Sequence, residues 1–124
     1  MRFKFLHLHL HGLIRSKNLE LGRDADTGGQ TQYVLELVKS LANTSDVDQV
    51  DLVTRLIDDS KVDNDYSKEE EFIEPGARIL RFKFGPNKYL RKDYDFKFFN
   101  PKVYKKADID KYYASLKKTF VLLR

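Results

Sequence analysis

The spacing of three apolar segments constrains the fold of this chain most strongly. Residues 2–10 alternate between leucines on one side and phenylalanines and histidines on the other, which is the two-residue period of a strand. Residues 29–42 carry apolar side chains at helical spacing, and residues 50–54 (Val-Asp-Leu-Val-Thr) read as a second strand. One helix between two strands is the arrangement of a parallel βαβ unit. The sequence therefore predicts an α/β fold with a partial Rossmann-like core.

Further elements are expected along the rest of the chain. Residues 79–84 predict a third short strand, which Gly85-Pro86 ends. Residues 58–76 are acidic and polar and end in Pro75-Gly76, so we expect a surface excursion there. From about residue 107 the apolar side chains recur at helical spacing with lysines largely elsewhere, which predicts a C-terminal amphipathic basic helix.

Length and charge indicate one small domain followed by a different tail. A chain of 124 residues has room for one core, and two full nucleotide-binding lobes do not fit. The net charge of +4 resides in residues 93–124, because residues 1–92 hold equal numbers of basic and acidic side chains. Half of the aromatic residues also lie in that tail. We therefore expect a domain boundary near residue 92, with 1–92 and 93–124 as separate units.

Several classes of protein are excluded by composition. The chain has no cysteine, so disulfide scaffolds, thiolate metal sites and cysteine nucleophiles are excluded. No apolar run approaches the roughly 20 residues of a membrane-spanning helix. Residues 1–10 contain basic and imidazole side chains and lack the apolar run of a signal peptide. A cytoplasmic location is the expectation.

The glycine pair Gly28-Gly29 stands between the first strand and the first turn of the helix. Glycines there permit positive φ angles and let backbone N–H groups approach an anion closely. A helix N-terminus adds unpaired donors and partial positive charge, and Gln30 adds an amide. On spacing alone, ordinary turn chemistry explains such a pair more often. Neither a Walker lysine pattern nor a Gly-x-Gly-x-x-Gly fingerprint is present.

A longer string is more specific. It comprises residues 11–15 (His-Gly-Leu-Ile-Arg), 18–31 (Asn-Leu-Glu-Leu-Gly-Arg-Asp-Ala-Asp-Thr-Gly-Gly-Gln-Thr) and 33–37 (Tyr-Val-Leu-Glu-Leu). This string resembles the start of the glycosyltransferase domain of the sucrose-phosphate synthase family, retaining enzymes of GT-B fold in glycosyltransferase family 4. Residues 50–55 and 77–92 resemble further segments of that family. The resemblance implies the first βαβ units of a GT-B N-terminal lobe.

The resemblance also implies an activity and a binding site. The family transfers glucose from UDP-glucose to fructose 6-phosphate, giving sucrose 6-phosphate and UDP, and needs no cofactor in this lobe. By resemblance, the loop Gly28-Gly29-Gln30 lines the cleft, and Lys88 and Lys92 hold the acceptor phosphate. Lysines four residues apart lie on one side of a helical turn, where two ammonium groups converge on a dianion. Without the resemblance, solvated surface charge is the commoner interpretation of these lysines.

Three other patterns carry less weight. His7, His9 and His11 share one face of a strand, but no compatible fourth zinc ligand is evident, so we interpret His7 and His9 as half-buried strand residues and predict no metal site. Asp24 and Asp26 are interpreted as solvated turn residues, with no catalytic residue assigned. The lysines and aromatics of the tail are explained by packing on the domain, so neither nucleic acid nor a membrane is predicted as a partner.

The family pattern ends after residues 92–93. The second lobe is not visible and the chain has no tryptophan, whereas the family continues with a Trp-Pro-containing helix. We therefore expect this chain alone to be inactive, because group transfer needs both substrates oriented across a closed cleft. Three interpretations stay open: a fragment of such an enzyme, a non-catalytic module that binds sugar phosphate or assembles with a separately encoded second lobe, and an interaction protein that uses the basic tail.

Overall fold

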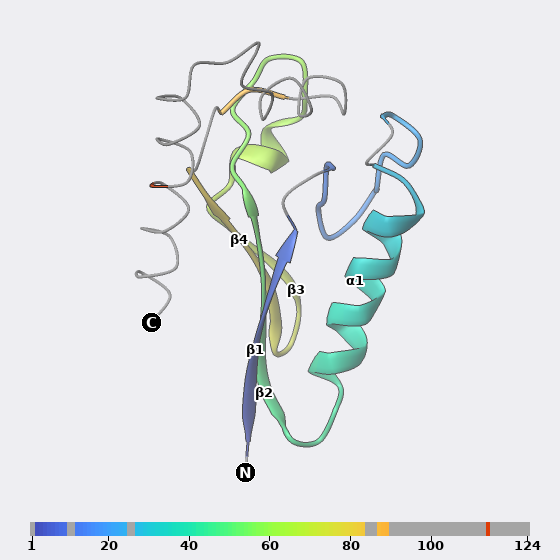
Figure 1. The fold of residues 1–124 in the computed structure, drawn as a ribbon, viewed down its shortest axis with the longest axis vertical. Coiled ribbons are helices and arrows are strands. Elements are labelled where there is room, and N and C mark those ends of the chain that lie inside the picture. Colours follow the sequence, from blue (N-terminus) through green and yellow to red (C-terminus); the bar gives the residue numbers. More distant parts are fainter. Residues whose placement is uncertain (1, 10–11, 25–26, 84–86, 90–113, 115–124) are drawn as a thin grey trace.

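The computed structural model describes residues 2–9, 12–24, 27–83, 87–89 and 114. Along the chain the elements are β1 (Phe3–His9), α1 (Gly29–Ala42), β2 (Val47–Arg55), the 3-10 helix η1 (Asn64–Ser67), β3 (Glu70–Glu74) and β4 (Ala77–Phe82). The strands of the described residues form a sheet in the order β1-β2-β4-β3. β1, β2 and β4 run parallel, and β3 is antiparallel to β4. α1 lies against one face of this sheet (Figure 1).

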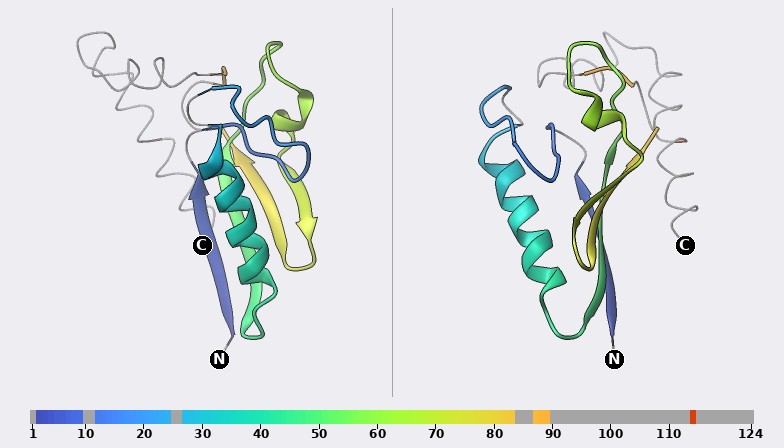
Figure 2. Two further views of the ribbon diagram at one scale, coloured as in Figure 1. Left: turned by 90° about the vertical axis from the view of Figure 1, so that its right-hand side faces the viewer. Right: turned by 180° about the vertical axis from the view of Figure 1, so that it is seen from behind.

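The parallel pairing of β1 and β2, joined through α1, confirms the predicted βαβ unit. The helix has the predicted bounds, β2 is longer than predicted, and β4 begins at Ala77, two residues before the predicted start of the third strand. Residues 12–24, which follow β1, and residues 56–67, which follow β2, gather at the carboxyl end of the parallel strands (Figure 2). This is the edge of an open α/β sheet where ligands bind.

α1 is amphipathic, and the side chain of the C-cap residue Asn43 caps its C-terminus. Val34, Leu35 and Val38 are buried against the sheet, as the helical spacing predicts. At the C-terminus the side chain of Asn43 donates to the carbonyl oxygen of Lys39 at 2.8 Å, which satisfies one of the carbonyls that a helix end leaves open. The ammonium group of Lys39 also interacts favourably with the negative end of the helix dipole.

The main core lies between α1 and the sheet. Val50 and Leu52 of β2 and Ile79 of β4 are each fully buried in it, and α1 covers them. The register aligns Phe5 with Val50 and His7 with Leu52, so these β1 residues face the same side. β1 lies at the edge of the sheet, however, and Phe5 stays 40% exposed. His9, at the end of β1, is buried rather than half-buried.

A second, smaller cluster supports the loops at the carboxyl edge. It consists of Leu13, Ile57, Val62 and Tyr66, with Tyr89 packed against it. The members come from the loop after β1, the segment after β2, η1 and the segment after β4. Three distant parts of the chain, the last of which comprises residues 87–89, are thereby held together beneath the loops that follow the strands.

Residues 58–76 are more ordered than a surface excursion, and that prediction was wrong in part. They contain η1 and β3, and β3 forms a hairpin with β4 across Pro75-Gly76. Gly76 has φ of 84°, which suits glycine after proline in a two-residue turn. The strand was missed because three of its five residues are glutamates, and because Phe72, its largest apolar side chain, is 68% exposed.

Two sequence predictions lie outside the described residues. Of the expected C-terminal amphipathic helix, the structure describes Ala114 alone, and the expected boundary near residue 92 is not described. Both stay predictions.

Candidate functional site

The glycine loop enters α1 in an extended conformation. Gly28 has φ of −142° and is the N-cap, and its carbonyl oxygen accepts from Thr31 N at 3.0 Å and Gln32 N at 3.3 Å. The positive φ expected of the Gly28-Gly29 pair is absent there; positive φ occurs instead at Gly12 and Gly22 in the preceding loop. A Cβ atom added at Gly28 or Gly29 would meet open space. The two glycines therefore place no side chain of their own at the N-terminus of α1.

Thr27 fixes the backbone immediately before this N-terminus. It is fully buried, and its hydroxyl oxygen accepts from the backbone N–H of Leu13 at 2.8 Å. Its own N–H donates to Oδ1 of Asp24 at 2.8 Å, and its carbonyl oxygen accepts from Gly22 N at 2.6 Å. The entry to α1 is thereby tied to the first residues after β1. Asp24 is thus a structural acceptor and not merely a solvated turn residue, which corrects the sequence interpretation.

A buried ion pair holds the start of this loop against the sheet. The guanidinium of Arg81, on β4, donates to Oε1 of Glu71 at 2.7 Å and to the carbonyl oxygen of Ile14 at 2.9 Å. The other oxygen of Glu71 accepts from Ser16 N at 2.5 Å. Burial opposes ionisation of Glu71, but the hydrogen bonds from Ser16 and Arg81 outweigh it and lower the pKa of the carboxyl group. Sequence reasoning missed this pair, because β3 was not recognised.

The middle of the loop after β1 contacts η1. The Tyr66 hydroxyl donates to Oε2 of Glu20 at 2.6 Å, and burial followed by this hydrogen bond raises the pKa of Tyr66. The guanidinium of Arg15 lies 5.3 Å from the centroid of the Tyr66 ring, within the range of a cation–π contact. Glu20 also pairs with Arg23 at 2.8 Å. These contacts order residues 15–23 next to the segment that follows β2.

Residues 87–89 are held at three successive positions. Asp58 N donates to the carbonyl oxygen of Asn87 at 2.8 Å, and Nη1 of Arg55 donates to that of Lys88 at 2.8 Å. Tyr89 N donates to Oδ2 of Asp59 at 3.0 Å, and the backbone hydrogen bond from Lys61, followed by this one, lowers the pKa of Asp59. The Lys88 side chain is exposed. The backbone of Lys88 is therefore fixed at the end of β2, while its ammonium group is open to solvent.

Tyr89 then joins this segment to the glycine loop. Its hydroxyl donates to Oδ2 of Asp24 at 2.5 Å, and the guanidinium of Arg23 lies 5.1 Å from its ring centroid. Of the predicted site residues, Gly28, Gly29 and Gln30 form the N-terminus of α1, and Lys88 belongs to a segment bonded to the turn just before it. Lys92 lies outside the described residues.

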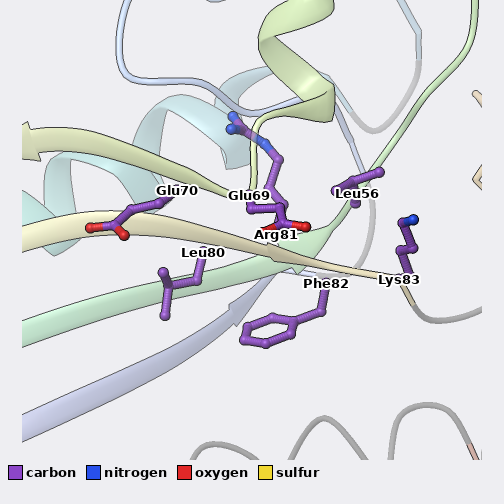
Figure 3. A pocket seen from close by; sticks show the side chains of 7 residues that line it. All are labelled: Leu56, Glu69, Glu70, Leu80, Arg81, Phe82 and Lys83. Atoms are coloured by element: carbon purple, nitrogen blue, oxygen red, sulfur yellow. The ribbon is translucent and has the colours of Figure 1, made fainter.

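A cavity of about 400 Å³ lies away from these residues, at the end of β4. Leu80 and Phe82 project to one side of the strand there, whereas Arg81 projects to the other, toward the loop after β1 (Figure 3). The remaining lining residues are Leu56, Glu69, Glu70 and Lys83. The described site residues Gly28, Gly29, Gln30 and Lys88 are not among the residues that line this cavity.

Metal ligation and membrane insertion find no support in the described part of the chain. Those residues contain no group of three or more histidine, aspartate or glutamate side chains arranged to hold a metal ion. His11, the third member of the histidine pattern, is not described. No helix among the described residues has the length and apolar character needed to cross a bilayer.

Comparison with solved structures shows the fold. The chain superimposes on sucrose-phosphate synthase from Thermosynechococcus elongatus with a TM-score of 0.63 and 22% identity, covering 97% of this chain and 25% of that one. No protein-family model matches the chain. The fold, with a glycine loop after the first strand of a parallel sheet, is that of part of a GT-B lobe.

Comparison with curated sequences gives the family. A probable sucrose-phosphate synthase 2 of Arabidopsis thaliana is 44% identical over 100 residues, which cover 69% of this chain and 10% of that protein. Sucrose-phosphate synthase 1 of the same plant is 43% identical over 101 residues, and a probable sucrose-phosphate synthase 4 of Oryza sativa subsp. japonica is 43% identical over 102. The chain belongs, as a partial homologue, to the sucrose-phosphate synthase family. It matches about a tenth of the length of these relatives.

Proposed function

We propose that this chain provides the phosphate-binding side of the acceptor site in a sucrose-phosphate synthase. The whole enzyme would transfer glucose from UDP-glucose to fructose 6-phosphate and release UDP. The observation that carries the proposal is the bonding of the Lys88 segment to the turn that precedes α1, through Tyr89 and Asp24. A phosphate at the N-terminus of α1 would then have an ammonium group from a second segment within the same site.

The chemistry of the two segments suits a phosphate dianion. The first N–H groups of a helix have no partner within the helix, and the helix dipole adds positive charge at that end. The first turn of α1 contains no acidic residue, and Gly28 and Gly29 leave room in front of it. Lys88 adds a full charge, and Lys92 is proposed to add a second. Gln30 is proposed to bond the sugar or the phosphate.

A non-catalytic role is the second candidate. The matched region is about a tenth of each relative, so the site that binds the uridine and most of the donor diphosphate would have to come from another polypeptide segment. A sugar-phosphate-binding module that assembles with a separately supplied second lobe fits this share of the length. A cytoplasmic location belongs to the same proposal, since a chain without cysteine suits a reducing compartment.

Amide NMR titration with fructose 6-phosphate tests the phosphate site. We expect the signals of Gly28, Gly29 and Lys88 to shift with fructose 6-phosphate and to shift much less with fructose. Lys88→Met should weaken binding about tenfold, since it removes a charge-assisted contact. Lys83→Met, which removes an exposed lysine at the end of β4, serves as the control and should leave the affinity unchanged. Equal responses to fructose and to its phosphate would contradict the assignment.

A further inference from the structure

Asp24 connects two segments that are 65 residues apart in the sequence. Its Oδ1 accepts from Thr27 N, and its Oδ2 accepts from the Tyr89 hydroxyl. We propose that Asp24 and Tyr89 are positioning residues that fix the separation between the N-terminus of α1 and Lys88, so that one phosphate contacts both. The inference rests on the proposed function and assigns to this pair a role in the same site.

The Asp24 side of the link acts on the entry to α1. The bond to Thr27 N ties Asp24 to the residue just before the N-cap, and Thr27 is anchored from the other side by Leu13 N and Gly22 N. Gly28 follows directly as the N-cap. A shift of the Asp24 carboxylate would therefore move the backbone that presents the first N–H groups of the helix.

The Tyr89 side of the link acts on Lys88. Backbone bonds from Asp58 and Arg55, and a bond to Asp59, fix residues 87–89 relative to the end of β2. None of these three bonds fixes the segment relative to the glycine loop. The Tyr89 hydroxyl does so, and the Arg23 guanidinium over its ring adds a second contact from the same loop. Tyr89 is thus the side chain through which the two halves of the proposed site meet.

A fixed separation between the N-terminus of α1 and Lys88 raises the affinity for phosphate, because the protein then loses little conformational freedom when the ligand binds. If the link is broken, the N-terminus of α1 and Lys88 can each still contact a phosphate. Fixing both against one phosphate then costs conformational entropy, which opposes binding. A bond that only stabilises the fold has a different signature, since it lowers the melting temperature and leaves the affinity of the folded protein unchanged.

Tyr89→Phe is the sharpest test, because it removes one hydroxyl and keeps the ring against Arg23 and the small apolar cluster. Tyr33→Phe makes the same change on an α1 side chain that is 65% exposed, and is the matched control. Asp24→Asn is a less direct variant, because it also removes a negative charge near the proposed anion site. The probes are inorganic phosphate and fructose 6-phosphate, titrated into the full 124-residue chain, with amide hydrogen exchange measured in the absence of ligand.

We expect Tyr89→Phe to weaken binding of both probes about tenfold, the loss typical of a hydrogen bond to a charged group, and to speed exchange at Thr27 and Gly28. Tyr33→Phe should do neither. Unchanged exchange at Thr27 and Gly28 in folded Tyr89→Phe would overturn the link, whether or not the wild-type chain binds phosphate. Faster exchange with unchanged affinity would overturn its role in positioning. A wild-type chain that binds neither probe would contradict the proposed function, and with it the role of the pair in binding, while the exchange rates would still decide whether the link exists.

Discussion

At the residue scale, the pair of Glu71 and Arg81 is the most buried ion pair among the described residues. The Arg81 side chain is 1% exposed and that of Glu71 is 14% exposed, so both charges are largely removed from water. Such a pair is tolerated only when the remaining polar atoms also have partners. Ser16 N donates to Glu71, and Arg81 donates to the carbonyl oxygens of Ile14 and Lys68. The pair therefore determines where the loop after β1 lies on the sheet.

The pH dependence of stability should report this pair. The pKa of Glu71 is lowered from its ordinary value of 4.5, so the folded state favours the ionised form. Its stabilising contribution is complete above that value and is lost as the pH falls through the lower, folded-state pKa. Glu71→Gln should therefore lower the free energy of unfolding by roughly 1.5–3 kcal/mol near neutral pH, and the difference from wild type should shrink below pH 4.5.

Urea unfolding across this pH range measures the effect. Glu70→Gln is the control, because Glu70 precedes Glu71 on β3 but is 63% exposed and pairs with Arg78 at 3.4 Å. Exposed pairs contribute little, so this variant should unfold almost as wild type at every pH. A difference between Glu71→Gln and wild type that does not vary with pH would contradict the assigned pKa direction.

The positions of individual site residues were predictable only where these residues are adjacent in the sequence. Gly28, Gly29 and Gln30 are adjacent in sequence, so their place at the start of α1 followed from the helical pattern. The neighbourhood of Lys88 depends on bonds to Asp24, Arg55 and Asp59, which lie far from it along the chain. No local pattern encodes such contacts. Lys88 was therefore chosen by family resemblance.

At the element scale, predictability followed burial. α1 and β2 carry apolar side chains at clear periods because each buries a face in the core, and their existence and order were predicted from that pattern. β3 lies at the sheet edge, where only Ile73 packs against the core cluster, so its pattern is dominated by glutamate. An edge strand is held largely by hydrogen bonds to its neighbouring strand. Its sequence therefore shows little of the hydrophobic pattern that marks a buried strand.

The same contrast predicts that replacing leucine by alanine lowers the free energy of unfolding by unequal amounts at the centre and at the edge of the sheet. Leu52, on the central strand β2, is fully buried beneath α1, whereas Leu6, on the edge strand β1, is 42% exposed. Leu52→Ala should lower the free energy of unfolding by about 2–5 kcal/mol, because it removes buried methyl groups and leaves a cavity. Leu6→Ala should lower it by about 0.5 kcal/mol or less, as most surface changes do. Thermal or urea unfolding of the two variants decides the matter, and similar losses would contradict the described placement of α1 over β2.

At the scale of the whole molecule, the sheet has the order of one half of a doubly wound fold. Three parallel strands succeed one another in the order β1-β2-β4, and β1 is one edge of the sheet that the described residues form. In doubly wound sheets the strand order reverses at the first strand, and the ligand crevice lies at that switch point. In the proposed function, the loop after β1 would form one wall of such a crevice.

One wall of a crevice can bind a ligand without performing group transfer. The chain covers 25% of the solved sucrose-phosphate synthase to which it is similar, and transfer requires donor and acceptor to be oriented against each other. We therefore predict that the 124-residue polypeptide, supplied with UDP-glucose and fructose 6-phosphate, releases no UDP above the rate without protein. The same preparation should still show the phosphate-dependent amide shifts, which separates an incomplete crevice from an unfolded chain. Turnover that rises in proportion to the concentration of this polypeptide, and that Lys88→Met abolishes, would mean that the chain completes the crevice by itself or by association with further copies.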